Sequence, residues 1–169
     1  MSAVAIVHTA LGTLALATGA VVLARPKGGR WHMRIGKVYV GAMLVLCLLS
    51  FALRDSTPMF EGFGPFHVAA LVSLATVSAG AWTAWRRKPG WLPWHFQWMA
   101  WSYIGLVMAT GGHVQGTLFV LLVEAGVARG LAIGLSLAAV WGLPPFVGSR
   151  MIAARVPAWL ALEQRPAPA

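Results

Sequence analysis

The chain has 169 residues, of which 59% are hydrophobic and only 10% are charged, and its mean hydropathy is +0.73. A soluble domain carries roughly a quarter of its residues as charged side chains, so this composition excludes a water-soluble enzyme and predicts an integral membrane protein. The net charge of +9 comes from 13 Lys and Arg against 4 Asp and Glu. It does not indicate a nucleic-acid partner, because the cations lie in short loops between apolar runs rather than on one polar face.

Four segments are apolar and long enough to cross roughly 30 Å of hydrocarbon, which takes about 20 helical residues. They are residues 3–24, 38–54, 66–85 and 95–112. A fifth segment, about 130–149, is apolar but carries Pro144 and Pro145 near its end. The sequence therefore predicts an all-α integral membrane protein, a four-helix transmembrane bundle plus a fifth spanning helix.

Residues 114–129 are ambiguous, because their longest apolar run is too short to span and they include Glu124 and Arg129. The segment fits an interfacial helix, a re-entrant segment or an overrun of the fourth helix. We take it as interfacial or re-entrant, within a single transmembrane helical domain at 1–155. Residues 156–169 are expected to form a cytoplasmic tail with a disordered, proline-rich end.

The placement of Lys and Arg predicts the orientation. If 130–149 spans, the first and third loops and the C-terminal tail share one side, which holds 11 of the 13 cations and leaves Arg54 and Arg129 on the other. Because cytoplasmic loops retain Lys and Arg, we expect a multi-pass protein of the bacterial inner (plasma) membrane with its N-terminus outside and its C-terminus in the cytoplasm. Five tryptophans at the cytoplasmic helix ends agree, as interface anchors: Trp31, Trp82, Trp85, Trp91 and Trp94.

This orientation sorts the five histidines by depth. His8, His67 and His113 share the outer layer, whereas His32 and His95 share the inner layer. Two imidazoles at one depth on different helices are what a b-type haem requires, and three can hold Zn or Cu. The alternative for each histidine is an ordinary interfacial side chain or helix cap. A haem b, a Zn or Cu ion in an outer site of His8, His67 and His113, or no cofactor at all are therefore open.

Two further patterns follow helical spacing. Gly12, Ala15 and Gly19 continue one face from His8, and such a small-residue stripe admits either a neighbouring helix or a flat cofactor. Tyr39, Met43 and Cys47 recur every four residues and are expected to line one face of the second helix. No nucleophile–base pair, paired carboxylates or phosphate-binding glycine loop is visible, so the sequence leaves an enzymatic activity undecided.

The segments KGGRWHMRIGKVYVGAMLVLCLLSF, FGPFHVAALVSLATVSAGAWTAWRR and HFQWMAWSYIGLVMA resemble a family of bacterial membrane proteins catalogued as the domain of unknown function 2306. The resemblance covers about residues 25–112 and implies no assigned activity; haem-bearing membrane cytochromes are similar only in helix number and histidine placement. One departure is that the chain has Gly111, Gly112 and His113 where the family pattern leads us to expect an arginine soon after the Ser-Tyr helix; either His113 substitutes for that arginine or the outer site differs. The matching positions are Lys27, Gly28, His32, Gly36, Tyr39, Met43, Pro65, His67, His95, Met99, Ser102 and Tyr103.

Three functions compete. The first is a small b-type cytochrome-like protein for electron transfer, in which His8 and His67, with His113, hold an outer haem and His95, with His32, an inner one. The ring N–H of each ligand then needs an acceptor, for which Thr9, Ser78 and Ser102 are candidates. The second is a cofactor-free scaffold, assembly or transport subunit. The third is a Zn- or Cu-binding protein. The lipid bilayer is the expected partner, with a homodimer or a membrane redox partner as further options.

Overall fold

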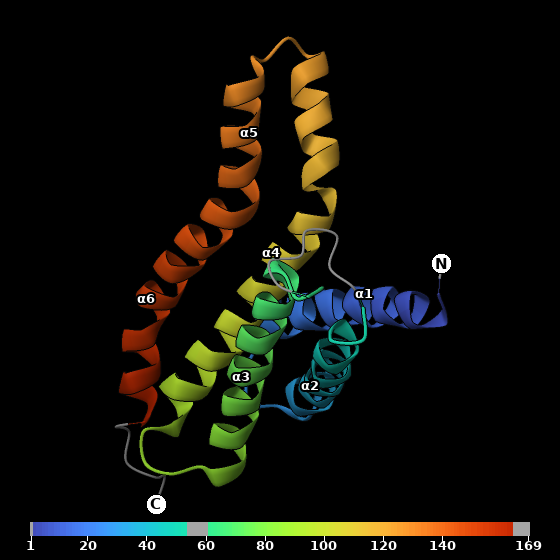
Figure 1. Cartoon of the computed structure of the whole chain (residues 1–169). Helices are drawn as coiled ribbons and strands as arrows, with labels where there is room; N and C mark the ends of the chain where they lie inside the picture. The colour runs from blue at the N-terminus through green and yellow to red at the C-terminus, as the bar shows by residue number, and fades with distance from the viewer. Residues whose placement is uncertain (1, 54–60, 164–169) are drawn as a thin grey trace, which may run out of the picture.

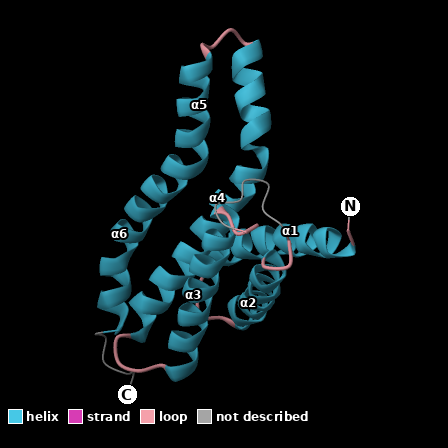
Figure 2. Cartoon of the chain, in the orientation of Figure 1, coloured by secondary structure: helices cyan, strands magenta, loops and turns pink. Residues whose placement is uncertain are grey.

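The structure is a computed structural model that describes residues 2–53 and 61–163, and this described part contains helices but no strand (Figure 2). Five helical stretches are long and apolar enough to cross a membrane: Ala3–Ala24, Arg30–Ser50, Pro65–Arg86, Trp91–Glu124 and Arg129–Ala158. The all-helical membrane architecture expected from the sequence is therefore confirmed for the described residues.

Helices α1 (Ala3–Ala24) and α2 (Arg30–Ser50) form the first hairpin. The Ser2 side chain begins α1 by accepting a hydrogen bond from the backbone N–H of Ala5 at 3.2 Å. Helix α2 begins at Arg30 rather than at residue 38. Its first turns therefore carry Arg34 and Lys37, which hydropathy alone assigns to a loop, because long cationic side chains can extend from a helix end toward the headgroups.

Helices α3 (Pro65–Arg86) and α4 (Trp91–Glu124) form the second hairpin. Helix α4 has 34 residues. At ~1.5 Å per residue it is about 50 Å long, which exceeds the roughly 30 Å of bilayer hydrocarbon. Residues 114–124 continue α4 without a break, so this segment is an overrun of the fourth helix and not a separate interfacial or re-entrant piece.

The fifth span consists of α5 (Arg129–Leu137), a π-helical turn η1 (Ala138–Gly142) and α6 (Leu143–Glu163). Pro144 and Pro145 lie just after η1, beyond Leu143, and lack a backbone N–H, which explains why the regular helical ladder widens there. Helix α6 continues to Glu163, so the first part of the expected C-terminal tail, residues 156–163, is helical. The expected disordered end, residues 164–169, lies outside the described residues. In Figure 1, α6 runs alongside α4. The C-terminal part of α4 and helix α5 extend together beyond α1–α3.

The core lies where α1–α4 meet, around Ala15, Tyr39, Met43 and Val77. The small-residue stripe of α1 has a packing role at Gly19, where an added Cβ would lie 2.9 Å from Tyr39 and still closer to the Tyr103 ring. In Figure 1, α1 lies across the α3–α4 pair rather than along it. Because of this crossing, α1 approaches α4 closely near Gly19 and diverges from it toward the N-terminus.

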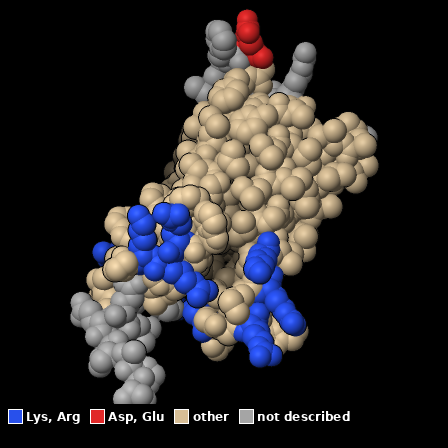
Figure 3. All heavy atoms as spheres, turned by 90° about the horizontal axis from the view of Figure 1, so that it is seen from below, with Lys and Arg blue, Asp and Glu red and all other residues tan. Residues whose placement is uncertain are grey.

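Most cations gather at one end of the molecule, here named the basic end: the α1–α2 turn, the α3–α4 turn and the C-terminal part of α6. Figure 3 shows Lys and Arg side chains collected there and an acidic side chain at the opposite side. Lys27 of the first turn lies close enough to Arg155 of α6 for their charges to repel. The cations of three segments that are far apart in the sequence therefore lie at one end of the molecule, as the placement of Lys and Arg in the sequence predicts.

Candidate functional site

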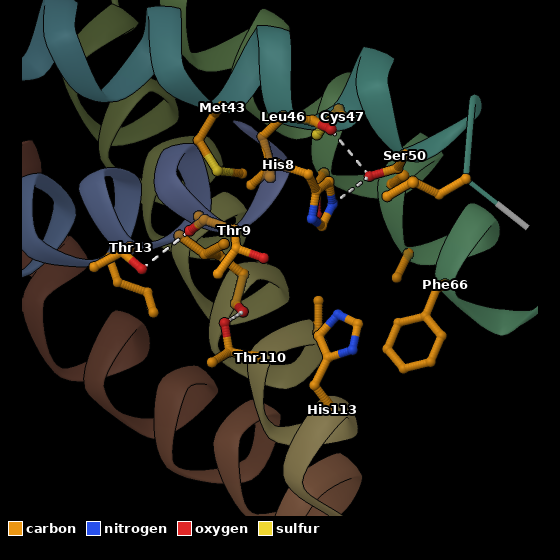
Figure 4. Close-up of a pocket in the computed structure, with 18 of the residues that line it drawn as sticks. His8, Thr9, Thr13, Met43, Leu46, Cys47, Ser50, Phe66, Thr110 and His113 are labelled. Atoms are coloured by element: carbon orange, nitrogen blue, oxygen red, sulfur yellow. Dashed lines mark hydrogen bonds between the residues drawn. The ribbon is translucent and has the colours of Figure 1, made fainter. Parts of the chain in front are cut away.

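At the end of the α1–α4 bundle opposite the basic end, the helices surround a cavity of about 590 Å³, here named the His8 cavity (Figure 4). This volume falls within the ~300–1,000 Å³ that is typical of small-molecule sites. Its wall includes Gly12, Met43 and Cys47, so the stripe on α1 and the buried face of α2 both reach it. Gly12 leaves open space, because the nearest atom to an added Cβ is Leu46 Cδ1 at 3.8 Å.

Several hydroxyl groups on the wall donate their hydrogens to carbonyls of their own helices. The Thr9 hydroxyl donates to Ala5 O at 3.0 Å, and the Thr110 hydroxyl donates to Leu106 O at 2.8 Å. Thr13 donates in the same way to Thr9 O. These oxygens can then offer only lone pairs to a bound molecule, which favours a ligand that accepts electron pairs or donates protons.

His8 is half-buried on α1, and its orientation is set by Ser50 at the end of α2. The Ser50 hydroxyl donates to Leu46 O at 3.0 Å, so its oxygen accepts from His8 Nε2–H at 3.1 Å. The neutral imidazole then has its lone pair on Nδ1. Sequence reasoning missed Ser50, although Ser50 and His8 occupy matching ends of neighbouring helices, and the depth argument used for the histidines would have found it.

His113 projects into the same cavity from α4. Its ring stacks on Phe66 of α3, with centroids 4.7 Å apart and planes 10° from parallel. The rings of His8 and His113 are 6.5 Å apart at 80°. Two imidazoles that bind one metal ion from opposite sides, with metal–nitrogen bonds of ~2.0–2.1 Å, have ring centres roughly 6 Å apart. The spacing of this pair is therefore suitable for a shared metal.

His67, the third residue of the expected outer layer, caps α3 instead. The backbone N–H of Gly64 donates to His67 Nδ1 at 3.1 Å, and His67 Nε2–H donates to Leu53 O at 3.0 Å. The ring also stacks on Phe63 at 4.7 Å. A neutral imidazole has one donor and one acceptor, and both are used here. His67 therefore fastens the start of α3 to the end of α2, and no ring lone pair remains for a metal.

A site of three ligands is not assembled. Within residues 2–53 and 61–163, no group of three or more His, Cys, Asp or Glu side chains is arranged to hold a metal ion. The outer site of His8, His67 and His113 for Zn or Cu thus stays a prediction, and only His8 and His113 have a geometry that favours it.

The other two histidines meet near the basic end. His95 Nδ1–H donates to Gly80 O at 2.8 Å, which leaves the lone pair on Nε2. His32 lies close enough to His95 for an electrostatic interaction, and its buried Nδ1 has no hydrogen-bond partner. The expected inner pair is therefore brought together.

The acceptors that hold His8 and His95 are Ser50 and a backbone carbonyl, not the hydroxyl groups expected from the sequence. Thr9 bonds to its own helix, and Ser102 accepts from the Tyr39 hydroxyl at 2.9 Å while donating to Met99 O. Ser78 is exposed on α3.

Several positions that carry the family resemblance connect helices. Tyr39 bonds to Ser102 across α2 and α4, and the Tyr103 hydroxyl donates to Leu16 O of α1 at 3.3 Å. Met99 packs against Gly80, where an added Cβ would lie 2.5 Å from its sulfur. These residues are explained by helix packing, so the resemblance reports a shared fold more directly than a shared reaction.

Comparison with known proteins gives one match. No curated protein and no solved structure matches the chain. The family described as "Predicted membrane protein (DUF2306)" matches residues 5–154, which extends the resemblance from the first hairpin through most of α6. With this match over most of its length, the chain belongs to the DUF2306 family of membrane proteins.

Proposed function

We propose that this protein holds one haem b in the His8 cavity, with His8 and His113 as the side chains that would bind its iron, and transfers electrons within or across the membrane. The observation that carries the proposal is the hydrogen-bond chain from His8 through Ser50 to Leu46 O. A histidine that binds a metal normally donates its other ring N–H to a fixed acceptor, and Ser50 is that acceptor for His8.

The surroundings of the pair fit the group. The ring spacing of 6.5 Å suits two ligands on one iron, Gly12 leaves open space beside them, and Phe66 supports the His113 ring. Haem iron supplies a one-electron redox couple whose potential depends on its ligands and on the polarity around it. The proposal is for one haem only, so it assigns no ligand role to His67, His32 or His95.

The proposal also includes the orientation and location. It takes the five helical stretches that are long and apolar enough to cross a membrane as five spans, with the basic end at the cytoplasmic face and the N-terminus outside. A bacterial inner membrane is the compartment in which this positive-inside pattern operates. A reporter fused to the C-terminus should therefore be active in the cytoplasm, whereas external activity would contradict the orientation.

One spectroscopic experiment tests the haem. The detergent-purified protein is titrated with haemin and reduced with dithionite, and we expect a Soret band that shifts on reduction. His8→Ala and His113→Ala should each lose most of the bound haem. His95→Ala, at the basic end, is the matched control and should keep the wild-type band. A protein that takes up no stoichiometric haem, or that loses it with His95→Ala, would refute the assignment.

A second candidate is a cofactor-free scaffold or transport subunit. It is favoured by the packing role of Tyr39, Met99 and Tyr103, which are among the residues that carry the family resemblance. The same titration separates the two functions, because a colourless protein without metal by elemental analysis supports the scaffold. Zinc or copper that is lost with His8→Ala would support the metal-binding alternative instead.

A further inference from the structure

The turn between α1 and α2 encloses a second cavity, of about 270 Å³, here named the Arg30 cavity. Its charged and polar lining comes from Arg25, Lys27, Arg30 and His32, and the side chain of Trp31 forms part of the wall. None of the residues that line it is acidic. The cavity is therefore a concave surface with a concentrated positive charge.

Lys27 builds this cavity rather than serving as a donor in it. Its ammonium group donates to Val22 O at 2.5 Å, Leu23 O at 2.8 Å and Arg25 O at 2.8 Å. These bonds satisfy carbonyls at the C-terminal end of α1 and use all three N–H groups. The remaining donors are the guanidinium groups of Arg25 and Arg30, which come from the two sides of the turn. Guanidinium groups bind phosphate through paired, charge-assisted hydrogen bonds.

No acidic residue is among those that line this cavity, so its wall does not offset the positive charge. Burial, and secondarily the positive charge of Arg155 on α6, lower the pKa of Lys27. Helix α2 begins at this point with no side-chain cap and no acidic residue in its first turn, so the positive end of its dipole adds to the field. His32 also lines the cavity, and its buried Nδ1 has no hydrogen-bond partner in the described part of the chain. A bound anion would offset the positive charge.

We propose that the Arg30 cavity binds a phosphate group, from the headgroup of an anionic phospholipid or from a soluble phosphate. The positive-inside pattern alone requires cations near this loop, but it requires neither a cavity nor an unpartnered histidine nitrogen. Trp31 is 67% exposed on the first turn of α2, and Trp85 is 71% exposed on the last turn of α3, which also lies at the basic end. Exposed indole rings at helix ends mark the headgroup level, where lipid phosphates are concentrated.

The test compares two variants with equal charge. Full-length protein in detergent is analysed by native mass spectrometry with phosphatidylglycerol, phosphatidylcholine or inorganic phosphate. Arg25→Gln/Arg30→Gln removes the two donors of the cavity. Arg86→Gln/Lys88→Gln removes two cations from the other turn of the basic end, outside the cavity lining. We expect the wild type and Arg86→Gln/Lys88→Gln to bind phosphatidylglycerol or inorganic phosphate equally well. Arg25→Gln/Arg30→Gln should bind the same probe at least about tenfold more weakly.

The arms separate the source of the phosphate. The site binds a lipid if the protein prefers phosphatidylglycerol to phosphatidylcholine and inorganic phosphate does not compete. The site binds a soluble ligand if inorganic phosphate itself binds saturably. Equal loss in both double variants, or no saturable binding in any arm, would overturn the proposal. Arg30→Lys keeps the charge but loses the paired geometry, so an intermediate loss is expected even if the double variant does not fold.

Discussion

The two cavities lie at opposite ends of the α1–α2 hairpin and offer opposite chemistry. The wall of the His8 cavity carries uncharged hydroxyls and imidazoles, and the hydroxyl hydrogens described above are already used. The Arg30 cavity is smaller and has charged donors with no acidic residue on its wall. The first therefore suits a metal centre or another electron-pair acceptor, and the second suits an anion.

The histidines show why residue type alone does not decide this difference. His8 and His67 both line the His8 cavity. His8 keeps a lone pair because Ser50 occupies its other nitrogen, whereas His67 has both nitrogens bonded to backbone groups. The difference comes from the start of α3: Gly64, the residue before this helix, has no side chain to cap it, so the His67 ring accepts the Gly64 N–H instead.

The largest effect on stability is expected on α1, where Gly19 packs against neighbouring helices and Gly12 lines the His8 cavity. Gly19→Leu should cost about 3 kcal/mol or prevent folding, because its side chain would enter the Tyr39 and Tyr103 rings. Gly12→Leu should fold, since an added Cβ would make only an ordinary contact with Leu46 Cδ1 at 3.8 Å, but should block the His8 cavity and abolish haem uptake. Thermal unfolding in detergent and haemin titration measure the two outcomes. Equal destabilisation by both variants would mean that α1 packs uniformly.

The next effect tests the positioning role of Ser50. Ser50→Ala removes the acceptor of His8 Nε2–H and should weaken haem affinity about 10- to 100-fold, with a shifted midpoint potential. Ser78→Ala, on the exposed side of α3, is the matched control. Unchanged affinity and potential in the Ser50 variant would show that His8 does not depend on this bond.

His67→Ala should act on stability rather than on the spectrum. The variant loses the cap of α3 and the link to Leu53 O, and we expect a loss of about 1–2 kcal/mol in the free energy of unfolding. The Soret band per bound haem should remain as in the wild type. A changed band with unchanged stability would return His67 to the ligand set that the sequence suggested.

The smallest effect concerns the helix contacts behind both cavities. Tyr39→Phe removes the hydrogen bond to Ser102 in the core and should cost about 1 kcal/mol, without affecting binding of haem or phosphate. Chemical or thermal unfolding measures the cost. A loss of either ligand would show that this contact couples the two ends.

The sequence alone predicts most of the helices, because a run of apolar residues long enough to cross hydrocarbon is a local property. It misses the beginning of α2 at Arg30, where cations extend a helix beyond its apolar part. It leaves the continuation of α4 to Glu124 as one of three arrangements, because the apolar run after His113 is short and ends at a charge. Pro144 and Pro145 indicate an end, yet the π-helical turn lets the helix continue.

Composition, hydropathy and charge placement thus determined that this is a helical membrane protein, which end collects its cations and which histidines share a depth. Only the tertiary structure decided which imidazoles keep a lone pair. That outcome depends on the residues that neighbouring helices place within 3 Å or so of each ring nitrogen, such as Ser50 for His8 and Gly80 O for His95. Such partners are far apart in the chain, and their contact arises from the crossing of helices rather than from any local pattern.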